Sequence, residues 1–167
     1  MLDVTVRLAA ASDLAAILAI NAAGQPGVVA FASDEVDGLA SGAIRCWVAE
    51  AVGRVAGYLI AYRQDETCEG DEFARFQRAY PSFLYVDQIA VAPEVRRAGA
   101  GSALYHAATA YATAQGIGML TCEVNLDPPN PGSLTFHQRL GFAEVGILRT
   151  YDDRTVRLLT LPLPAAL

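Results

Sequence analysis

The most constraining stretch of the sequence covers residues 83–114, FLYVDQIAVAPEVRRAGAGSALYHAATAYATA. Its apolar first part, residues 83–91, is typical of a buried strand, and the segment from Gly99 onward is typical of a helix rich in small residues. Residues 92–98 form a short loop between them. Because the first N–H groups of a helix lack partners and the helix dipole adds positive charge there, this stretch predicts an anion site of the kind that holds phosphate.

Glycine and arginine residues at the predicted helix start favour the same interpretation. Gly99 and Gly101 carry no Cβ, so a bulky anion can approach their backbone closely. Arg96 and Arg97 add positive charge beside them. A tight turn before the helix and a solvated arginine pair remain the simpler alternative.

A dinucleotide-binding fingerprint fits this stretch poorly. That fingerprint requires Gly-x-Gly-x-x-Gly or Ala directly after a strand. Here the third position is Leu104, and seven residues separate Val91 from Gly99. Glu123 does lie near the distance expected of the acid that binds the ribose, but the remainder of the pattern is missing.

Length and charge narrow the class of protein. A chain of 167 residues is long enough for one substantial core, so we expect a single domain over residues 1–167. The net charge of −6 argues against a nucleic-acid partner and suits a cationic amine substrate. No apolar run approaches the roughly 20 residues of a membrane span, so we expect no membrane partner.

The three cysteines, Cys46, Cys68 and Cys122, make an odd number without the paired spacing of a metal site. No signal-peptide pattern precedes them. We therefore expect no metal and a cytoplasmic protein.

Hydrophobic periodicity divides the whole chain into strands and helices. Strands are predicted at residues 4–8, 45–51, 54–62, 83–91, 119–124, 143–149 and 155–161. Besides the helix from Gly99, helices are predicted after a cap at Ser12, from Ser33 or Asp34 to near Gly42, within residues 63–81, and at residues 131–140. Residues 125–129 break the strand before the last of these helices. Strand, helix and strand in succession predict two parallel strands joined by a crossover.

Two motifs in this order resemble those of GNAT acetyltransferases. The first is Arg96-Arg97-Ala98-Gly99-Ala100-Gly101, which fits the pattern Arg/Gln-x-x-Gly-x-Gly/Ala. The second, residues 130–142, is similar to the family segment Asn-x-x-Ala-x-x-Phe-Tyr-x-x-x-Gly-Phe. The resemblance covers nearly the whole chain and is greatest to a bacterial group of predicted acetyltransferases.

The resemblance implies a mixed α/β fold, with a mostly antiparallel sheet, one parallel pair formed by the fourth and fifth strands, and helices on its faces. It implies an acetyl-CoA-dependent N-acetyltransferase, in which an amine attacks the acetyl group directly. The implied coenzyme A contacts are Ile89, Ala90 and Val91 for the pantetheine arm, Arg96, Arg97, Ala98, Gly99, Ala100, Gly101 and Ser102 for the pyrophosphate, and Asn130, Ser133 and Phe136 opposite the arm.

Three residues are candidates for proton transfer. His137 stands where the family commonly has the tyrosine that protonates the departing thiolate; a structural histidine bonded to a nearby carbonyl is the alternative. Asp87 and Glu123 are carboxylates within apolar strands and are candidate general bases, unless each forms a salt bridge with an arginine. Asp87 is preferred because it lies two residues before Ile89, hence on the same strand face.

The acceptor is expected to be a small molecule or a peptide with a primary amine. By resemblance, residues 22–28 form one wall of its site, although an ordinary helix connection is an equal alternative. Residues 63–81 either cover the acceptor site or pack their aromatic side chains on the core. The histidine at position 137 keeps a non-catalytic acyl-CoA-binding module open as an alternative, and the family's final strands often mediate homodimers.

Overall fold

The computed structural model describes residues 3–165. Its strands are β1 (Val4–Leu8), β2 (Cys46–Ala51), β3 (Arg54–Arg63), β4 (Leu84–Val91), β5 (Met119–Asp127), β6 (Ala143–Arg149) and β7 (Thr155–Pro162). Its α-helices are α1 (Leu14–Gly24), α2 (Ser33–Ser41), α3 (Asp71–Ala79), α4 (Ala100–Ala114) and α5 (Pro131–Arg139), with short 3-10 turns at Ala11–Asp13 and Pro93–Val95. Each predicted strand and helix is present.

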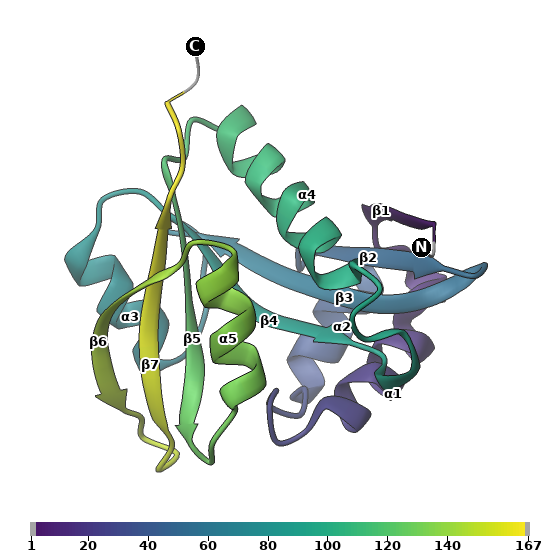
Figure 1. Ribbon diagram of the computed structural model, residues 1–167, viewed down its shortest axis with the longest axis horizontal. Helices are drawn as coiled ribbons and strands as arrows, with labels where there is room; N and C mark the ends of the chain where they lie inside the picture. The colour runs from purple at the N-terminus through teal and green to yellow at the C-terminus, as the bar shows by residue number, and fades with distance from the viewer. Residues whose placement is uncertain (1–2, 166–167) are drawn as a thin grey trace. The chain divides into compact units, whose positions relative to one another are not determined.

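Within the described residues the strands form one mixed sheet of order β1-β2-β3-β4-β5-β7-β6 (Figure 1). The predicted hairpins β2–β3 and β6–β7 are antiparallel, and β4 and β5 are parallel as predicted. In the parallel pair, Leu84 opposes Leu120 and Tyr85 opposes Thr121. The expected fold class is therefore confirmed.

The chain divides into two compact units, and β4 and α4 contribute to both. The first unit contains the residues up to Ala61 together with Gln88–Ala108. Its buried core includes Ile17, Val48 and Leu104. The second unit contains Tyr62–Asp87 and the residues from Thr109 onward.

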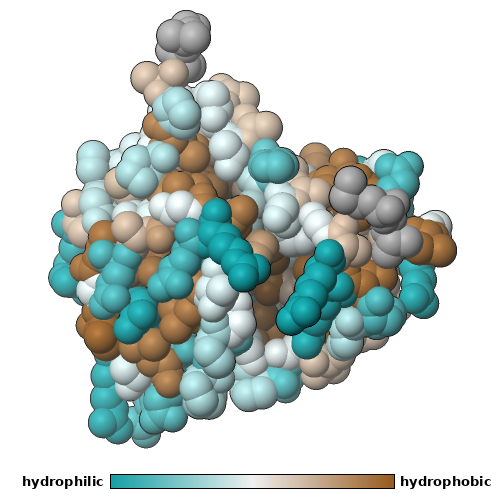
Figure 2. Space-filling view, viewed as in Figure 1, coloured by the Kyte–Doolittle hydropathy of each residue, from teal (hydrophilic) through white to brown (hydrophobic). Residues whose placement is uncertain are grey.

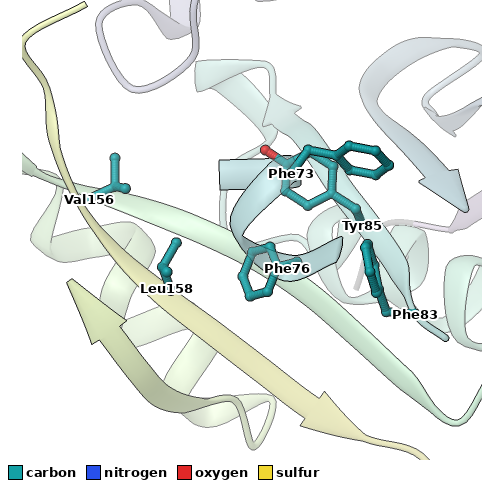
Figure 3. Close-up of a cluster of buried hydrophobic side chains, with 6 residues drawn as sticks. All are labelled: Phe73, Phe76, Phe83, Tyr85, Val156 and Leu158. Atoms are coloured by element: carbon teal, nitrogen blue, oxygen red, sulfur yellow. The ribbon is translucent and has the colours of Figure 1, made fainter. Parts of the chain in front are cut away.

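Aromatic residues of α3 pack on the sheet of the second unit. Phe73 and Phe76 lie in one buried cluster with Phe83, Tyr85, Val156 and Leu158 (Figure 3). Of the two alternatives for residues 63–81, packing on the core therefore describes α3. Figure 2 shows hydrophobic surface over the edge strand β6, where Val145 is 43% and Ile147 59% exposed.

Three local predictions were wrong. Ser12 lies inside the first 3-10 turn and does not cap α1, which follows Asp13. The residue before α2 is Ala32, whose N–H donates to the Glu35 carboxylate at 2.8 Å, so neither Ser33 nor Asp34 is the cap.

The third error concerns the end of β5. This strand continues to Asp127, because β7 supplies ladder partners for Asn125 and Asp127 across a shift in register. A partner strand thus extends an element that its own sequence would end at residue 124.

Candidate active site

The predicted phosphate loop, residues 96–102, is built mainly from backbone. Gly99 has φ +89°, a conformation that L side chains rarely adopt, and nothing lies within 4 Å of the position of a Cβ there. Arg97 also has positive φ, and both arginines of the loop are exposed. At the helix start, the N–H of Ala103 donates to Gly99 O at 3.0 Å. The N–H of Ala98 already donates to Val95 O at 3.2 Å, so the N–H groups from Gly99 to Ser102 are those that the helix start offers to an anion.

The strand predicted to hold the pantetheine arm lies close to a glycine of β3. A Cβ on Gly57 would lie 2.9 Å from the Ala90 carbonyl oxygen and 3.3 Å from a methyl carbon of Val91. The N–H of Ala92 donates to Ala56 O at 2.8 Å. Gly57 therefore permits the close approach of β3 and β4 at this point.

A buried polar network, which sequence reasoning missed, fixes the segment between α1 and α2. The side-chain amides of Asn21 and Gln88 both donate to the Val29 carbonyl oxygen, at 2.9 and 3.0 Å. The Tyr58 hydroxyl donates to Gln88 Oε1 at 2.8 Å. Polar residues within the apolar stretches of α1 and β4 were the available signal, since buried amides require partners.

In the second unit, Glu123 is partly buried on β5 and accepts a hydrogen bond from the Tyr85 hydroxyl at 2.8 Å. Burial raises the pKa of Glu123 well above its ordinary value, and the negative charges of Glu72 and Asp87 raise it further. Burial likewise raises the pKa of Tyr85, so this hydroxyl remains a donor. A carboxyl whose pKa is raised accepts a proton more readily than an ordinary glutamate does.

Around this pair lies a second set of polar side chains from distant parts of the sequence. Arg154, between β6 and β7, forms an ion pair with buried Glu72 of α3 at 2.8 Å. Another guanidinium nitrogen donates to Asn125 Oδ1 at 3.1 Å. No local pattern indicates that Glu72 and Arg154 meet, because 82 positions separate them.

His137 is 2% exposed. Its Nδ1 lies 2.7 Å from the Ser133 carbonyl oxygen and 3.3 Å from Ser133 Oγ. Burial lowers the pKa of the imidazole, while the bond to the Ser133 carbonyl raises it to a smaller extent. A neutral ring that donates from Nδ1 matches the structural alternative, a histidine bonded to a nearby carbonyl.

The other predicted residues of α5 also have structural contacts. The side chain of Asn130 caps the helix by accepting from Ser133 N at 3.3 Å. The ring of Phe136 packs edge-on against His137, with 5.2 Å between ring centroids. Neither observation assigns a cofactor contact.

The structure brings some of the predicted site residues together. Asp87 and Glu123 interact electrostatically, and Ser133 contacts His137. The phosphate loop and residues 89–91 lie in the first unit, whereas Asn130, Phe136 and the proton-transfer candidates lie in the second.

Residues 3–165 hold no cluster of three or more His, Cys, Asp or Glu side chains placed to bind a metal ion. In the same range, no helix combines the length and apolar character needed to cross a membrane.

Solved structures share this fold at low sequence identity. The ribosomal-protein-S18-alanine N-acetyltransferase from Escherichia coli is 20% identical, with a TM-score of 0.72 over 98% of this chain and 96% of that chain. Arabidopsis thaliana NAA60, in complex with acetyl-CoA, is 15% identical, with a TM-score of 0.78 over 96% of this chain and 98% of that chain. Salmonella typhimurium yncA, with its cofactor acetyl-CoA, is 20% identical, with a TM-score of 0.71 over 98% and 95%.

Comparison with curated protein sequences finds no match. The model of the acetyltransferase (GNAT) family, however, matches residues 21–142, which is more than half of the chain. Fold and family match together define an acyltransferase. The chain belongs to the acetyltransferase (GNAT) family.

Proposed function

We propose that this chain is one acetyltransferase domain that transfers the acetyl group of acetyl-CoA to a primary amine of a small molecule or a protein N-terminus. The family match includes residues of both units, which supports a single functional domain. In the reaction, the amine nitrogen bonds to the acetyl carbon, the carbon–sulfur bond breaks, and the sulfur leaves as a thiolate. One proton must leave the amine and one must reach the sulfur.

Residues 96–102 are the proposed pyrophosphate site. The open space beside Gly99, the helix start after it and the exposed charges of Arg96 and Arg97 support this assignment. Ile89, Ala90 and Val91 are proposed to bond the pantetheine arm through their backbone, with Asn130, Ser133 and Phe136 as further contacts. Acetyl-CoA is bound by two of the structures that share the fold, which supports this choice of donor.

The observation that carries the proposed chemistry is the pairing of Glu123 with Tyr85. Glu123 is proposed as the general base that takes a proton from the substrate ammonium and so generates the neutral amine that attacks, because burial raises its pKa and makes it a stronger proton acceptor. The Tyr85 hydroxyl fixes one carboxyl oxygen of Glu123. Asp87, the base preferred from sequence, is the second candidate. Its negative charge raises the pKa of Glu123 and so supports Glu123 as the group that takes the proton.

His137 is the weaker candidate for the acid that protonates the thiolate. At its ordinary pKa, about a quarter of histidine side chains are protonated at pH 7. The lowered pKa of His137 reduces that fraction, and its Nδ1 faces the Ser133 carbonyl. Comparing His137→Phe with His137→Tyr tests this role: unchanged turnover in the phenylalanine variant excludes His137 as the acid.

A thermal melt with and without acetyl-CoA, followed by a screen of polyamines, amino acids and peptides with free N-termini, tests the proposed function. A ligand that binds only the folded state raises stability by RT ln(1 + [L]/Kd). We expect a higher melting temperature with acetyl-CoA and release of coenzyme A with at least one amine. Stabilisation without transfer to any amine would favour the non-catalytic acyl-CoA-binding module. An unchanged melting temperature would contradict the proposal that acetyl-CoA is the donor.

A further inference from the structure

Helix α3 places a carboxylate inside the second unit. Glu72 lies in its first turn, is 4% exposed and forms an ion pair with Arg154 Nη2 at 2.8 Å. Next to it in sequence, Phe73 belongs to the aromatic cluster of Figure 3. The carboxylate of Asp71 accepts the Tyr151 N–H at 2.7 Å. Glu72 is therefore held in a fixed position by packing and by a second bond to the β6–β7 turn.

All three guanidinium nitrogens of Arg154 donate hydrogen bonds within the second unit. Nη2 bonds Glu72, Nε bonds Asp152 Oδ2 at 2.8 Å, and Nη1 bonds Asn125 Oδ1 at 3.1 Å. Asn125 lies two residues after Glu123 on β5, so both side chains are on one face of the strand. The guanidinium is thus anchored beside the face that carries Glu123.

We propose that Glu72 is a positioning residue for Glu123: its ion pair with Arg154 holds the guanidinium against Asn125 and Asp152 and away from the Glu123 carboxyl, which therefore remains a base. This inference rests on the proposed role of Glu123. An arginine that paired with Glu123 directly would stabilise the carboxylate and weaken it as a proton acceptor.

The charges around Glu123 agree with this assignment. Glu72 from α3 and Asp87 from β4 raise the pKa of Glu123, whereas Arg154 from the β6–β7 connection and the bond from Tyr85 lower it. If Glu72 lost its charge, Arg154 would lose a buried partner and act more strongly on Glu123. The pKa of Glu123 would then fall, and the acid limb of the pH–rate profile would move to lower pH.

The test uses the full chain with isotope-labelled glutamate carboxyls, titrated by NMR. The signal of Glu123 is identified by its absence in Glu123→Gln. In Glu72→Gln, which keeps the shape of the side chain, we expect the titration midpoint of Glu123 to fall by at least about one pH unit. The acid limb of the pH profile of kcat/KM should move to lower pH together with this midpoint. An unchanged midpoint would overturn the proposal.

Two further variants separate positioning from a structural role. Glu72→Gln/Arg154→Gln replaces the buried pair by neutral amides, and its Glu123 midpoint should return to within about half a unit of the wild type. A shift as large as that of the single variant would overturn the proposal, because Glu72 would then not act through Arg154. If Glu72→Gln does not fold, Glu72→Asp decides: it keeps the buried charge but shortens the side chain away from Arg154, so the midpoint of Glu123 should fall, and an unchanged midpoint would overturn the proposal.

Glu69→Gln is the matched control, because Glu69 lies in the same segment but is exposed. In this variant the titration midpoint of Glu123 should equal that of the wild type. A shift like that in Glu72→Gln would show that the effect is not specific to Glu72. The titration does not depend on acetyl transfer. A shifted midpoint in a chain that acetylates no amine would therefore refute the proposed function and leave the effect of Glu72 on Glu123 intact.

Discussion

The phosphate loop of the first unit and the carboxyl cluster of the second are built in different ways. The loop depends on backbone conformation, with positive φ at Arg97 and Gly99 and a helix start directly after them. The cluster depends on side chains: Glu123 bonds Tyr85, and Arg154 bonds Glu72 and Asn125.

This difference has consequences for how each region can fail. A backbone site tolerates changes in its surroundings but not a side chain at its glycine. A cluster of buried polar groups depends on every partner, because an unpaired buried charge is unfavourable. Substitutions that affect one region and spare the other therefore test the comparison.

The largest expected effect comes from Phe76→Ala, which removes a fully buried ring from the α3 cluster. We expect a loss of about 3–5 kcal/mol in the free energy of unfolding, measured by urea titration. Phe31→Ala in the first unit is the control, because Phe31 is only half-buried and should lose less. Equal losses would show that the cluster does not depend on the packing of α3.

Gly99→Glu tests the backbone site. A glutamate there must adopt φ +89° and adds negative charge where the pyrophosphate is proposed to bind. We expect acetyl-CoA binding, measured by calorimetry, to weaken at least about a hundredfold, or about 2.7 kcal/mol. Gly42→Glu is the matched control, since Gly42 also has positive φ and open space but lies at the end of α2. Equal loss of acetyl-CoA binding in both variants would refute the assignment of the pyrophosphate site to residues 96–102.

Gly57→Ala tests the contact between β3 and β4. Its new Cβ would lie 2.9 Å from the Ala90 carbonyl oxygen, so the backbone must shift. We expect a loss of about 1–3 kcal/mol in stability by urea unfolding, accompanied by weaker acetyl-CoA binding. Gly118→Ala, where nothing lies within 4 Å of the new Cβ, should lose less stability and keep binding. The reverse order would contradict the role of Gly57.

The smallest effect is a pH dependence of stability that differs in sign between the units. The folded pKa of Glu123 lies above its unfolded value, so the folded state binds the extra proton and stability falls as pH rises through that window. The Arg7 hydrogen bond lowers the folded pKa of Asp13, so its contribution is present above the unfolded pKa and is lost as pH falls.

Urea unfolding across pH measures both contributions. Glu123→Gln should flatten the fall in stability above the ordinary glutamate range, and Asp13→Asn should flatten the loss in acid. A pH dependence of wild-type shape in both variants would refute the two assignments.

The same contrast explains which features the sequence predicts. The Gly99 loop and the helix after it depend on neighbouring residues, so local patterns suffice. Glu123 could be selected as a carboxylate within an apolar strand, but its partner Tyr85 lies 38 positions away. Glu72 appeared only as part of an acidic segment, and its burial follows from the packing of α3. No local pattern contains such a contact.

Predictions from local sequence also fail where another residue or strand supplies the hydrogen bond that the expected residue would make. Ala32 precedes α2 although alanine has no side-chain acceptor, because the Glu35 carboxylate accepts its N–H. β5 extends to Asp127 because β7 pairs with it. In each case, the prediction fails where an interaction partner decides the structure.

The most direct test of the central claim is the pH–rate profile of acetyl transfer for the wild type and Glu123→Gln, with the amine that the screen identifies. We predict a wild-type acid limb above the ordinary glutamate pKa, and in the variant a turnover lower by about 10²–10⁴-fold without that limb. Binding of acetyl-CoA should be unchanged. Wild-type turnover with the same acid limb in Glu123→Gln would contradict the assignment of Glu123 as the general base.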